Sequence, residues 1–388
     1  MLALIGLAEM LAMSPWFSAT AVSGDIAREF HLDSAQAAWL TMAVQGGFVA
    51  GTLVSALLNL ADLVSARWVF AAGCVVAALT NAMTTTAPSP FEAVAWRFAT
   101  GSALALVYPT GMKLVAGWFK ANRGAAFGVL VGSLTLGKAL PYLFAALSDG
   151  AWRSTILMSS GLSLAAGVLV LLTVRDGPHV STSAPFDPSA AVRMFTRRAT
   201  RLGVLGYFGH MWELYAMWTW VAVYVTAALV VQGHPHADHL GALAGFVAIG
   251  AGAAGCVIAG VYADRLGRAR VAAWAMMVSA TCCALTVPGF HAPYVVIVVL
   301  VAVWGFSVVA DSAQFSAIVS ETSPPEHLGT ALTVQTCLGF LLTMVSIRLV
   351  SAAAAVAGWQ WAFLIVLPGP LLGVQAMTVM MRGRVSGE

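Results

Sequence analysis

Apolar runs of about 20 residues recur from one end of this 388-residue chain to the other. A helix of that length crosses the hydrocarbon core of a bilayer. Apolar residues make up 60% of the chain and charged residues only 9%, against about 25% in soluble domains. This pattern excludes a soluble fold and predicts an all-helical, polytopic membrane protein. We place twelve transmembrane helices at residues 2–22, 36–58, 67–86, 91–116, 124–146, 154–174, 201–228, 241–263, 270–288, 292–316, 328–351 and 360–381.

One connection is much longer and more polar than the others. Residues 175–200 are rich in proline, serine and arginine, a composition typical of a partly flexible linker. This linker divides the chain into two six-helix bundles, residues 1–174 and residues 201–388.

Basic residues are distributed unevenly between the two sides of the predicted membrane. Cytoplasmic loops of membrane proteins carry an excess of lysine and arginine. With the N-terminus inside, the outer loops hold only Arg28 and Arg153. The cytoplasmic segments hold Arg67, Lys120, Arg123, Arg175, Arg193, Arg197, Arg198, Arg201, Arg265, Arg268, Arg270, Arg382 and Arg384. The asymmetry predicts that both termini and the linker are cytoplasmic, in a plasma or inner membrane.

Short patterns recur about 200 residues apart, which indicates a duplicated six-helix unit. Residues 9–16 and 213–220 share E-x-x-A-M-x-x-W at an offset of 204, and Asp62 matches Asp264 at an offset of 202. The first span is therefore the counterpart of the seventh and is expected to stay in the mature protein, although its end imitates a signal-peptidase site. Two related membrane halves point towards transport.

The loop after the eighth span carries the pattern G-x-x-x-D-R-x-G-R-x-R. It resembles the loop motif of the major facilitator superfamily, and the resemblance covers the whole chain. The first-half loop keeps only Asp62 and Arg67 of the motif. The resemblance implies a gate in which charged pairs make or break as two halves rock; the alternative is that the arginines only anchor the loop at the headgroups. The gating residues are then Asp62, Arg67, Gly260, Asp264, Arg265, Gly267, Arg268 and Arg270.

Eight ionisable residues lie inside the predicted spans, where a charge needs a cavity or a partner. They are Glu9, Arg97, Lys113, Lys138, His210, Glu213, Asp311 and Arg348. The resemblance implies that spans 1, 4, 7 and 10 line a central pathway, and six of the eight lie on those spans. For Lys113 we favour snorkelling to the headgroups.

The buried cations predict an anionic cargo. Arg97 and Lys138 could hold a carboxylate, with the arginine as a bidentate fork and the lysine as a point charge. Alternatively, Arg97 forms a structural salt bridge, or Glu9, Glu213 and Asp311 neutralise the two cations or select a cationic cargo instead. Tyr108 shares the helical face of Arg97, and Asp311 lies one turn before Gln314.

Aromatic rings crowd the seventh span, and we expect Trp212 or Tyr215 to touch substrate. The alternative is that these rings only pack against neighbouring helices or lie at the membrane interface.

Carboxylates in the first and seventh spans are candidate proton carriers. Glu9 is a mid-helix carboxylate in apolar surroundings, and Glu213 holds the equivalent position with His210 one turn before it. Permanent pairing of Glu9 with Arg97 or Lys138 is the competing interpretation, and His210 could equally be a hydrogen-bonded packing residue.

These observations predict proton-coupled import of a small organic anion by rocking alternating access. The alternatives are proton-driven export of amphipathic compounds or drugs and, in a different class, a membrane sensor or assembly partner that moves no cargo. We expect no enzymatic activity, no cofactor, no structural metal and no nucleic-acid partner, and a monomer in the lipid bilayer. Residues 234–239 (HPHADH) could capture a metal, but such loops are more often solvated. No P-loop pattern is present, so ATP is not expected as the energy source.

Overall fold

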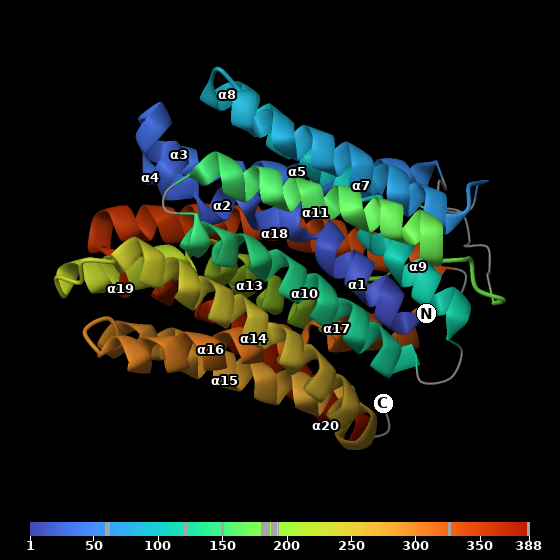
Figure 1. Cartoon of the computed structure of the whole chain (residues 1–388). Coiled ribbons are helices and arrows are strands. Elements are labelled where there is room, and N and C mark those ends of the chain that lie inside the picture. The colour runs from blue at the N-terminus through green and yellow to red at the C-terminus, as the bar shows by residue number, and fades with distance from the viewer. Residues whose placement is uncertain are drawn as a thin grey trace.

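A computed structural model describes residues 1–58, 63–119, 123–148, 151–179, 187, 192, 194–324 and 327–385. Its described elements are helices that run roughly along one axis (Figure 1). Both chain termini lie at the same end of the bundle, which we call the terminal end; the opposite end, near α3 and α19, is the far end.

The N-terminal half supplies the first six spans. Their elements are α1 (Leu2–Ala12), η1 (Ser14–Phe17) and α2 (Ser18–Ala21); α4 (Ser34–Ala37) and α5 (Trp39–Leu57); α7 (Ala66–Met83) and η2 (Thr84–Thr86); α8 (Pro90–Leu104) and α9 (Tyr108–Trp118); α10 (Arg123–Leu147); and α11 (Trp152–Thr173). A short helix, α3 (Ser23–Phe30), follows the first span at the far end.

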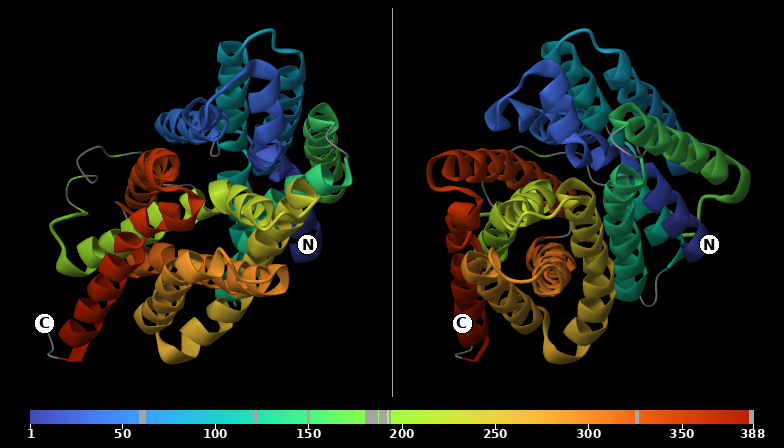
Figure 2. Two further views of the ribbon diagram at one scale, coloured as in Figure 1. Left: turned by 90° about the vertical axis from the view of Figure 1, so that its left-hand side faces the viewer. Right: turned by 60° about the vertical axis from the view of Figure 1, so that its left-hand side comes forward.

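The C-terminal half supplies the other six. Its elements are α13 (Arg198–Val231); α14 (Ala237–Leu266); α15 (Arg268–Gly289); α16 (Tyr294–Ala310) and α17 (Ser312–Thr322); α18 (Leu328–Ala357); and α19 (Trp359–Ala362), η4 (Phe363–Ile365) and α20 (Pro368–Val385). The halves lie side by side as two bundles, one blue to green and the other yellow to red (Figure 2), and meet where α10 packs against α14 and α5 against α18.

Eleven helical stretches of the described chain are long and apolar enough to cross a membrane. The fourth predicted span is the twelfth, and it is broken between α8 and α9. Pro109 explains the break, because it has no backbone N–H for the carbonyl of Ala105 and its ring clashes with that carbonyl. The tenth span is interrupted at Asp311, between α16 and α17, without a proline. The first span also breaks, at Ser14 and Pro15.

The internal repeat is visible in the packing as well as in the sequence. A Cβ atom added to Gly101 would lie 1.9 Å from the Val44 carbonyl oxygen, and one added to Gly305 would lie 1.7 Å from that of Ala248. At both positions any Cβ atom would clash, so only glycine lets the two helix backbones come into contact. The second pair lies 204 positions after the first, and α17 lies 204 positions after α9 at both of its ends. The two halves thus share one packing scheme.

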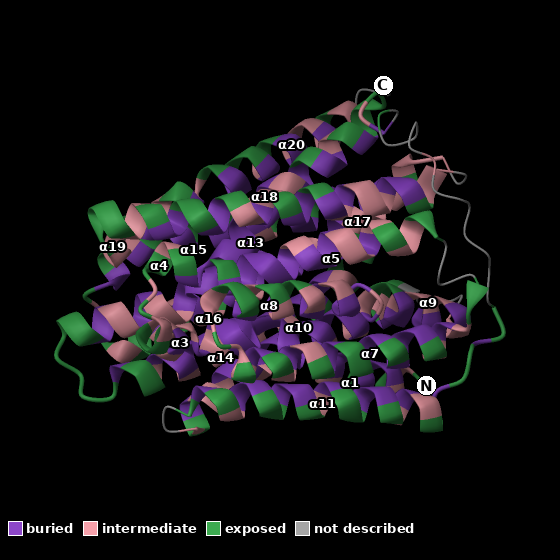
Figure 3. Ribbon diagram, turned by 90° about the horizontal axis from the view of Figure 1, so that it is seen from above, coloured by how far each residue is buried: buried purple, intermediate pink, exposed green. Residues whose placement is uncertain are grey.

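Burial follows the expected membrane pattern. Buried positions face the interior of the bundle, whereas exposed positions lie on its outside (Figure 3). The outward residues include large apolar side chains such as Leu79, Leu172 and Leu372, which suit contact with lipid. The buried set includes ten acidic, basic or amide side chains inside the spans, namely Glu9, Gln45, Asn81, Arg97, Lys138, His210, Glu213, Asp311, Gln314 and Gln335.

Candidate functional site: a central cavity between the halves

A cavity of about 500 Å³ lies between the two halves. At the terminal end its lining includes Gly124, Gly260 and Leu328, which lie at or near the ends of α10, α14 and α18. Its inner end reaches Trp16 and Lys138. The cavity is therefore accessible from the terminal end and narrows towards the middle of the spans.

Rings from both halves close the inner end of the cavity. The ring centroid of Trp16 lies 5.1 Å from that of Phe48, 5.8 Å from Tyr215 and 5.5 Å from Phe340. Edge and tilted contacts of this kind stabilise an aromatic cluster beyond the effect of buried area alone. The cluster forms an apolar wall, as the ring-rich seventh span suggested, but three of its four rings come from other spans.

A second cavity, of about 580 Å³, lies at the far end and is lined in part by Asp25, Arg28 and His236. Between the two cavities stands the aromatic layer, which we define as Phe17, Tyr142 and Trp218. The Tyr142 hydroxyl donates to the Trp218 carbonyl at 2.7 Å, and the Phe17 and Trp218 ring centroids lie 5.9 Å apart. This layer joins the halves and separates the two cavities.

Lys138 is the cation of the central cavity. Its side chain is buried on α10, and its ammonium donates to the Tyr215 hydroxyl of the other half at 2.7 Å. The Nζ atom also lies 4.1 Å from the ring centroid of Trp16 and 5.5 Å from that of Trp218, within cation–π range. Within the described part of the chain, no carboxylate forms an ion pair with Lys138. A bound anion would therefore meet a cation that is not already neutralised by contact.

Arg97 has a different environment. It is fully buried on α8 and lies outside the lining of the cavity. Its guanidinium donates to acceptors from three other spans: the carbonyls of Leu40 (3.2 Å), Pro15 (2.9 Å) and Trp16 (2.6 Å), Ser18 Oγ (3.3 Å) and Asn81 Oδ1 (2.6 Å). The carbonyls of Pro15 and Trp16 belong to the broken part of the first span. Arg97 therefore ties that break to the second, third and fourth spans, a locking role played through carbonyls rather than through a carboxylate.

Glu9 is fully buried on α1, and neither carboxylate oxygen has a hydrogen-bond partner among the described residues. It forms no ion pair there with Arg97 or Lys138. A Cβ atom added to Gly111 would lie 2.4 Å from Glu9 Oε2, so the missing side chain of this glycine makes room for the carboxylate against α9. An unpartnered carboxylate inside a membrane protein is costly when ionised, which suits it to binding a proton.

Glu213, its counterpart on α13, is buried but hydrogen-bonded. Its Oε1 accepts from Ser279 Oγ at 2.8 Å and from Trp304 Nε1 at 2.7 Å. His210 does not contact Glu213 through any hydrogen bond recorded for the described residues, although their helical spacing makes such a contact geometrically possible. Its Nδ1 instead lies 2.8 Å from Asp311 Oδ1, at the break in the tenth span.

The seven residues expected to bind substrate are thus divided between several places. Lys138, Tyr108, Tyr215 and Gln314 line the central cavity. Arg97, Trp212 and Asp311 lie outside its lining. The Trp212 indole donates to the Ile365 carbonyl at 3.1 Å beside a separate apolar groove on the C-terminal half.

Sequence reasoning did not place Trp16, Phe340 or Thr135 in the site, although all three line the cavity. For Thr135 a signal existed, because it lies three positions before Lys138 and hence on the same helical face. For Trp16 the repeat E-x-x-A-M-x-x-W marked the position, but it did not show that the side chain points into the cavity. Phe340 carried no comparable pattern.

The structure describes only part of the two predicted gating loops. Asp62 lies outside the described residues, and Arg67 is half-buried beside the ring of Trp68. Gly267 adopts φ of +90° between α14 and α15, a conformation that favours glycine and explains its place in the motif. Arg265 and Arg270 are exposed.

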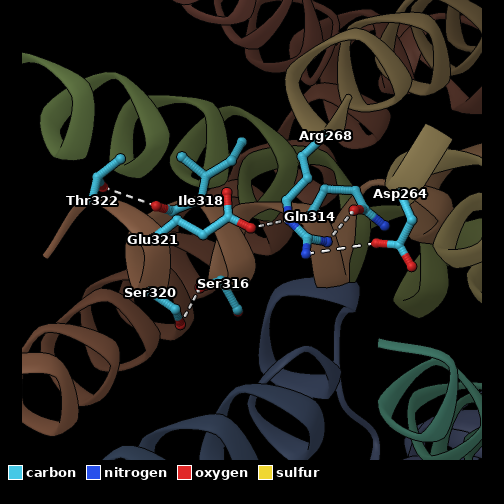
Figure 4. A network of polar contacts seen from close by, with 8 residues as sticks. All are labelled: Asp264, Arg268, Gln314, Ser316, Ile318, Ser320, Glu321 and Thr322. Atoms are coloured by element: carbon cyan, nitrogen blue, oxygen red, sulfur yellow. Dashed lines mark hydrogen bonds and ion pairs between the residues drawn. The ribbon is translucent and has the colours of Figure 1, made fainter. Parts of the chain in front are cut away.

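Arg268 is the centre of a polar network at the mouth of the cavity (Figure 4). It donates to Glu321 at 2.6 Å, lies 3.7 Å from Asp264 Oδ1, and reaches Gln314 Oε1 at 3.5 Å. All of these residues belong to the C-terminal half. Asp264 also faces the N-terminal half: a Cβ atom at Gly124, in the first turn of α10, would lie 3.6 Å from its Oδ2. The carboxylate is therefore placed at a positive helix end of the opposite half.

Comparison with known proteins agrees with this architecture. A model of the Major Facilitator Superfamily matches residues 4–234 and 225–385. Two crystal structures of the nucleoside transporter NupG, one of them a point mutant, resemble the fold. The mutant gives a TM-score of 0.74 at 16% identity over 98% of this chain and 99% of that chain. The other gives 0.72 at 16% identity over 98% of each. The chain is therefore a membrane transporter, not an enzyme, and belongs to the major facilitator superfamily.

Proposed function

We propose that this transporter imports a small organic anion together with protons. The observation that carries the proposal is the ammonium of Lys138, which lies at the inner end of the cavity with no contacting carboxylate among the described residues. A carboxylate on the substrate would supply the missing counter-charge and accept the remaining N–H donors of the lysine.

The surroundings of Lys138 suit an anion that also has an apolar body. The indole nitrogens of Trp16 and Trp218 are buried donors with no acceptor among the described residues, and both side chains line the cavity. Their rings supply apolar surface beside the charge. A flat carboxylic acid with further oxygen or nitrogen acceptors would satisfy the ammonium and both indoles after modest side-chain movement.

Glu9 is the proton carrier in this proposal. Its carboxylate lacks a partner and rests on α9, the segment that also brings Tyr108 to the cavity. Glu213 is held by two donors, so we assign it a structural role. Proton binding drives transport only if it favours one facing state over the other.

The terminal end is the cytoplasmic side in this proposal, because it carries the excess of basic residues. The structure is then inward-facing, in a plasma or inner membrane. Residues 1–174 and 201–388 act as the rocking domains of a monomer, and Asp264 with Arg268 forms the cytoplasmic latch.

The proposal is tested with purified protein in liposomes loaded with a pH-sensitive dye. Addition of one member of a panel of small aromatic and aliphatic carboxylates should acidify the interior. Lys138→Gln should abolish that response. Lys113→Gln is a matched control, because this lysine lies on the neighbouring α9 outside the cavity lining, and the response should persist. No response to any carboxylate, or an equal response from Lys138→Gln, would overturn anion import.

A second candidate function is uptake of a neutral nucleoside, favoured by the aromatic lining of Trp16, Tyr215 and Phe340, on which a base could stack. The fold of NupG is shared, but at 16% identity the likeness concerns fold alone. Nucleosides and lipophilic cations therefore join the panel. Acidification with a nucleoside would favour this candidate, and proton efflux with cations would favour drug export.

A further inference from the structure

His210 and Asp311 form a buried pair at the interruption of the tenth span. Their side chains are 0% and 2% exposed, and Nδ1 lies 2.8 Å from Oδ1. The ring of His210 also packs on Phe315 at 5.7 Å between centroids. The pair thus ties α13 to the first turn of α17. Asp311 is the residue between α16 and α17, so this contact is made at the hinge itself.

The segment beyond this hinge forms much of the cavity mouth. Seven residues that line the cavity come from α17, namely Ser312, Ala313, Gln314, Ser316, Ala317, Ser320 and Glu321. Its end is held by the contact of Glu321 with Arg268. Helix α17 is therefore a short segment that packs along α13 and α15, with one acidic contact at the hinge and another at the mouth. A rotation about the hinge would change the width of the mouth.

The charge of the pair depends on one proton. With a neutral imidazole and an ionised Asp311, the pair carries a buried net negative charge. Both ring nitrogens of His210 and Oδ1 of Asp311 are buried without a hydrogen bond of good geometry within the described ranges, so the 2.8 Å contact is a close approach and Nε2 has no competing partner. The resulting imidazolium and carboxylate form a neutral pair with a stronger mutual attraction.

Other titratable groups surround the pair. Glu213 on α13 and Cys256 on α14 interact electrostatically with Asp311, and the Tyr207 ring lies 6.0 Å from that of His210. None of these three residues donates a hydrogen bond to the pair in the recorded contacts of the described chain.

We propose that His210 and Asp311 are a second proton-binding unit, separate from Glu9, and that its protonation holds α17 in the open position seen here. This rests on the proposed proton-coupled import: the proton arrives from outside, stabilises the state that faces the terminal end, and its loss to that side releases α17 for the return step. The anion site at Lys138 and this proton unit are then located on opposite halves.

Cysteine accessibility tests the proposal without any substrate. Ser320→Cys places a thiol on α17, and Leu328→Cys places a control thiol on α18 in the same cavity. All five native cysteines are buried, so their background is low. The rate of labelling by a charged maleimide at Ser320→Cys, divided by that at Leu328→Cys, cancels the ordinary pH dependence of thiols. We expect this ratio to be several-fold higher at pH 6 than at pH 8.

The pair is then altered in the same background. Asp311→Asn, which keeps the side-chain shape, and His210→Gln should each make the ratio independent of pH, whereas Glu213→Gln should preserve the pH response. Two variants of the pair are used so that, if one variant misfolds, the other still tests the proposal. A ratio independent of pH in the parent, or unchanged pH dependence in the folded variants, overturns the inference. Loss of anion transport with pH-dependent labelling intact would instead overturn only the proposed function.

Discussion

The two halves place a glutamate at the same position of the repeat but treat it differently. Glu9 has no hydrogen-bond partner in the described chain and rests against Gly111, whereas Glu213 accepts from Ser279 and Trp304. The position of Gly111 corresponds to Phe315 in the second half, 204 residues later. The comparison teaches that duplication preserves the backbone scheme, while the neighbours of one carboxylate decide whether it is left open for the proton role proposed for Glu9 or holds helices together.

The largest expected effect separates the two glutamates directly. Glu9→Gln should abolish accumulation driven by a proton gradient but spare substrate exchange, because the Glu9 proton site is lost while Lys138 remains. Glu213→Gln should leave accumulation close to wild type, since an amide oxygen can still accept from Ser279 and Trp304. Radiolabelled uptake and counterflow in proteoliposomes measure both. Normal accumulation by the Glu9 variant, or its loss in the Glu213 variant, would reverse the assignment.

The halves also differ in how they stabilise their interiors. Arg97 satisfies five acceptors in the N-terminal half, but the equivalent position of the repeat is the apolar Val301. Arg97→Met should lower the free energy of unfolding by about 3 kcal/mol, because buried carbonyls lose their donor. Thermal unfolding in detergent measures the change. Arg348→Met, at an exposed position of α18, should have little effect; equal loss in both variants would refute the interpretation.

A smaller effect is expected from the donors of Glu213. Ser279→Ala removes one of its two hydrogen bonds and should destabilise the protein by about 1 kcal/mol. Thr281→Ala on the same helix is the control, because that hydroxyl is exposed and only bonds back to Met277. If both variants melt alike, Glu213 does not depend on this contact.

The smallest expected effect lies outside the membrane. The Arg153 guanidinium, with help from the Trp152 indole, holds the pKa of Glu29 below its usual range. Because the pKa of Glu29 is lower in the folded protein than in the unfolded chain, its ionised carboxylate stabilises the fold at pH values above the unfolded pKa. That stabilisation is lost as the pH falls through the folded pKa. Glu29→Gln should therefore reduce the melting temperature slightly at pH 7 and have no effect in strong acid. A larger effect in acid would contradict this sign.

Much of the architecture could be read from the sequence, because helix length and apolarity are local properties. The twelve spans and the repeat followed from them. Pro109 could have revealed the break in the fourth span, whereas the break at Asp311 has no proline to mark it. Partners were harder to predict: Ser279 and Trp304 reach Glu213 from 66 and 91 residues away, and His210 selects Asp311 instead of its close neighbour. Such contacts depend on helix rotation and tilt, which periodicity does not determine.

The aromatic layer of Phe17, Tyr142 and Trp218 has an electrical consequence. A cavity lies on each side of it, so the low-dielectric part of the molecule is thinnest there. The transmembrane voltage then falls mainly across these rings instead of evenly along the helices. A charge that crosses the layer gains or loses about 2.3 kcal/mol per 100 mV. The rate of the transport cycle should therefore depend on membrane potential mainly through the event in which a charge crosses this layer, next to Lys138.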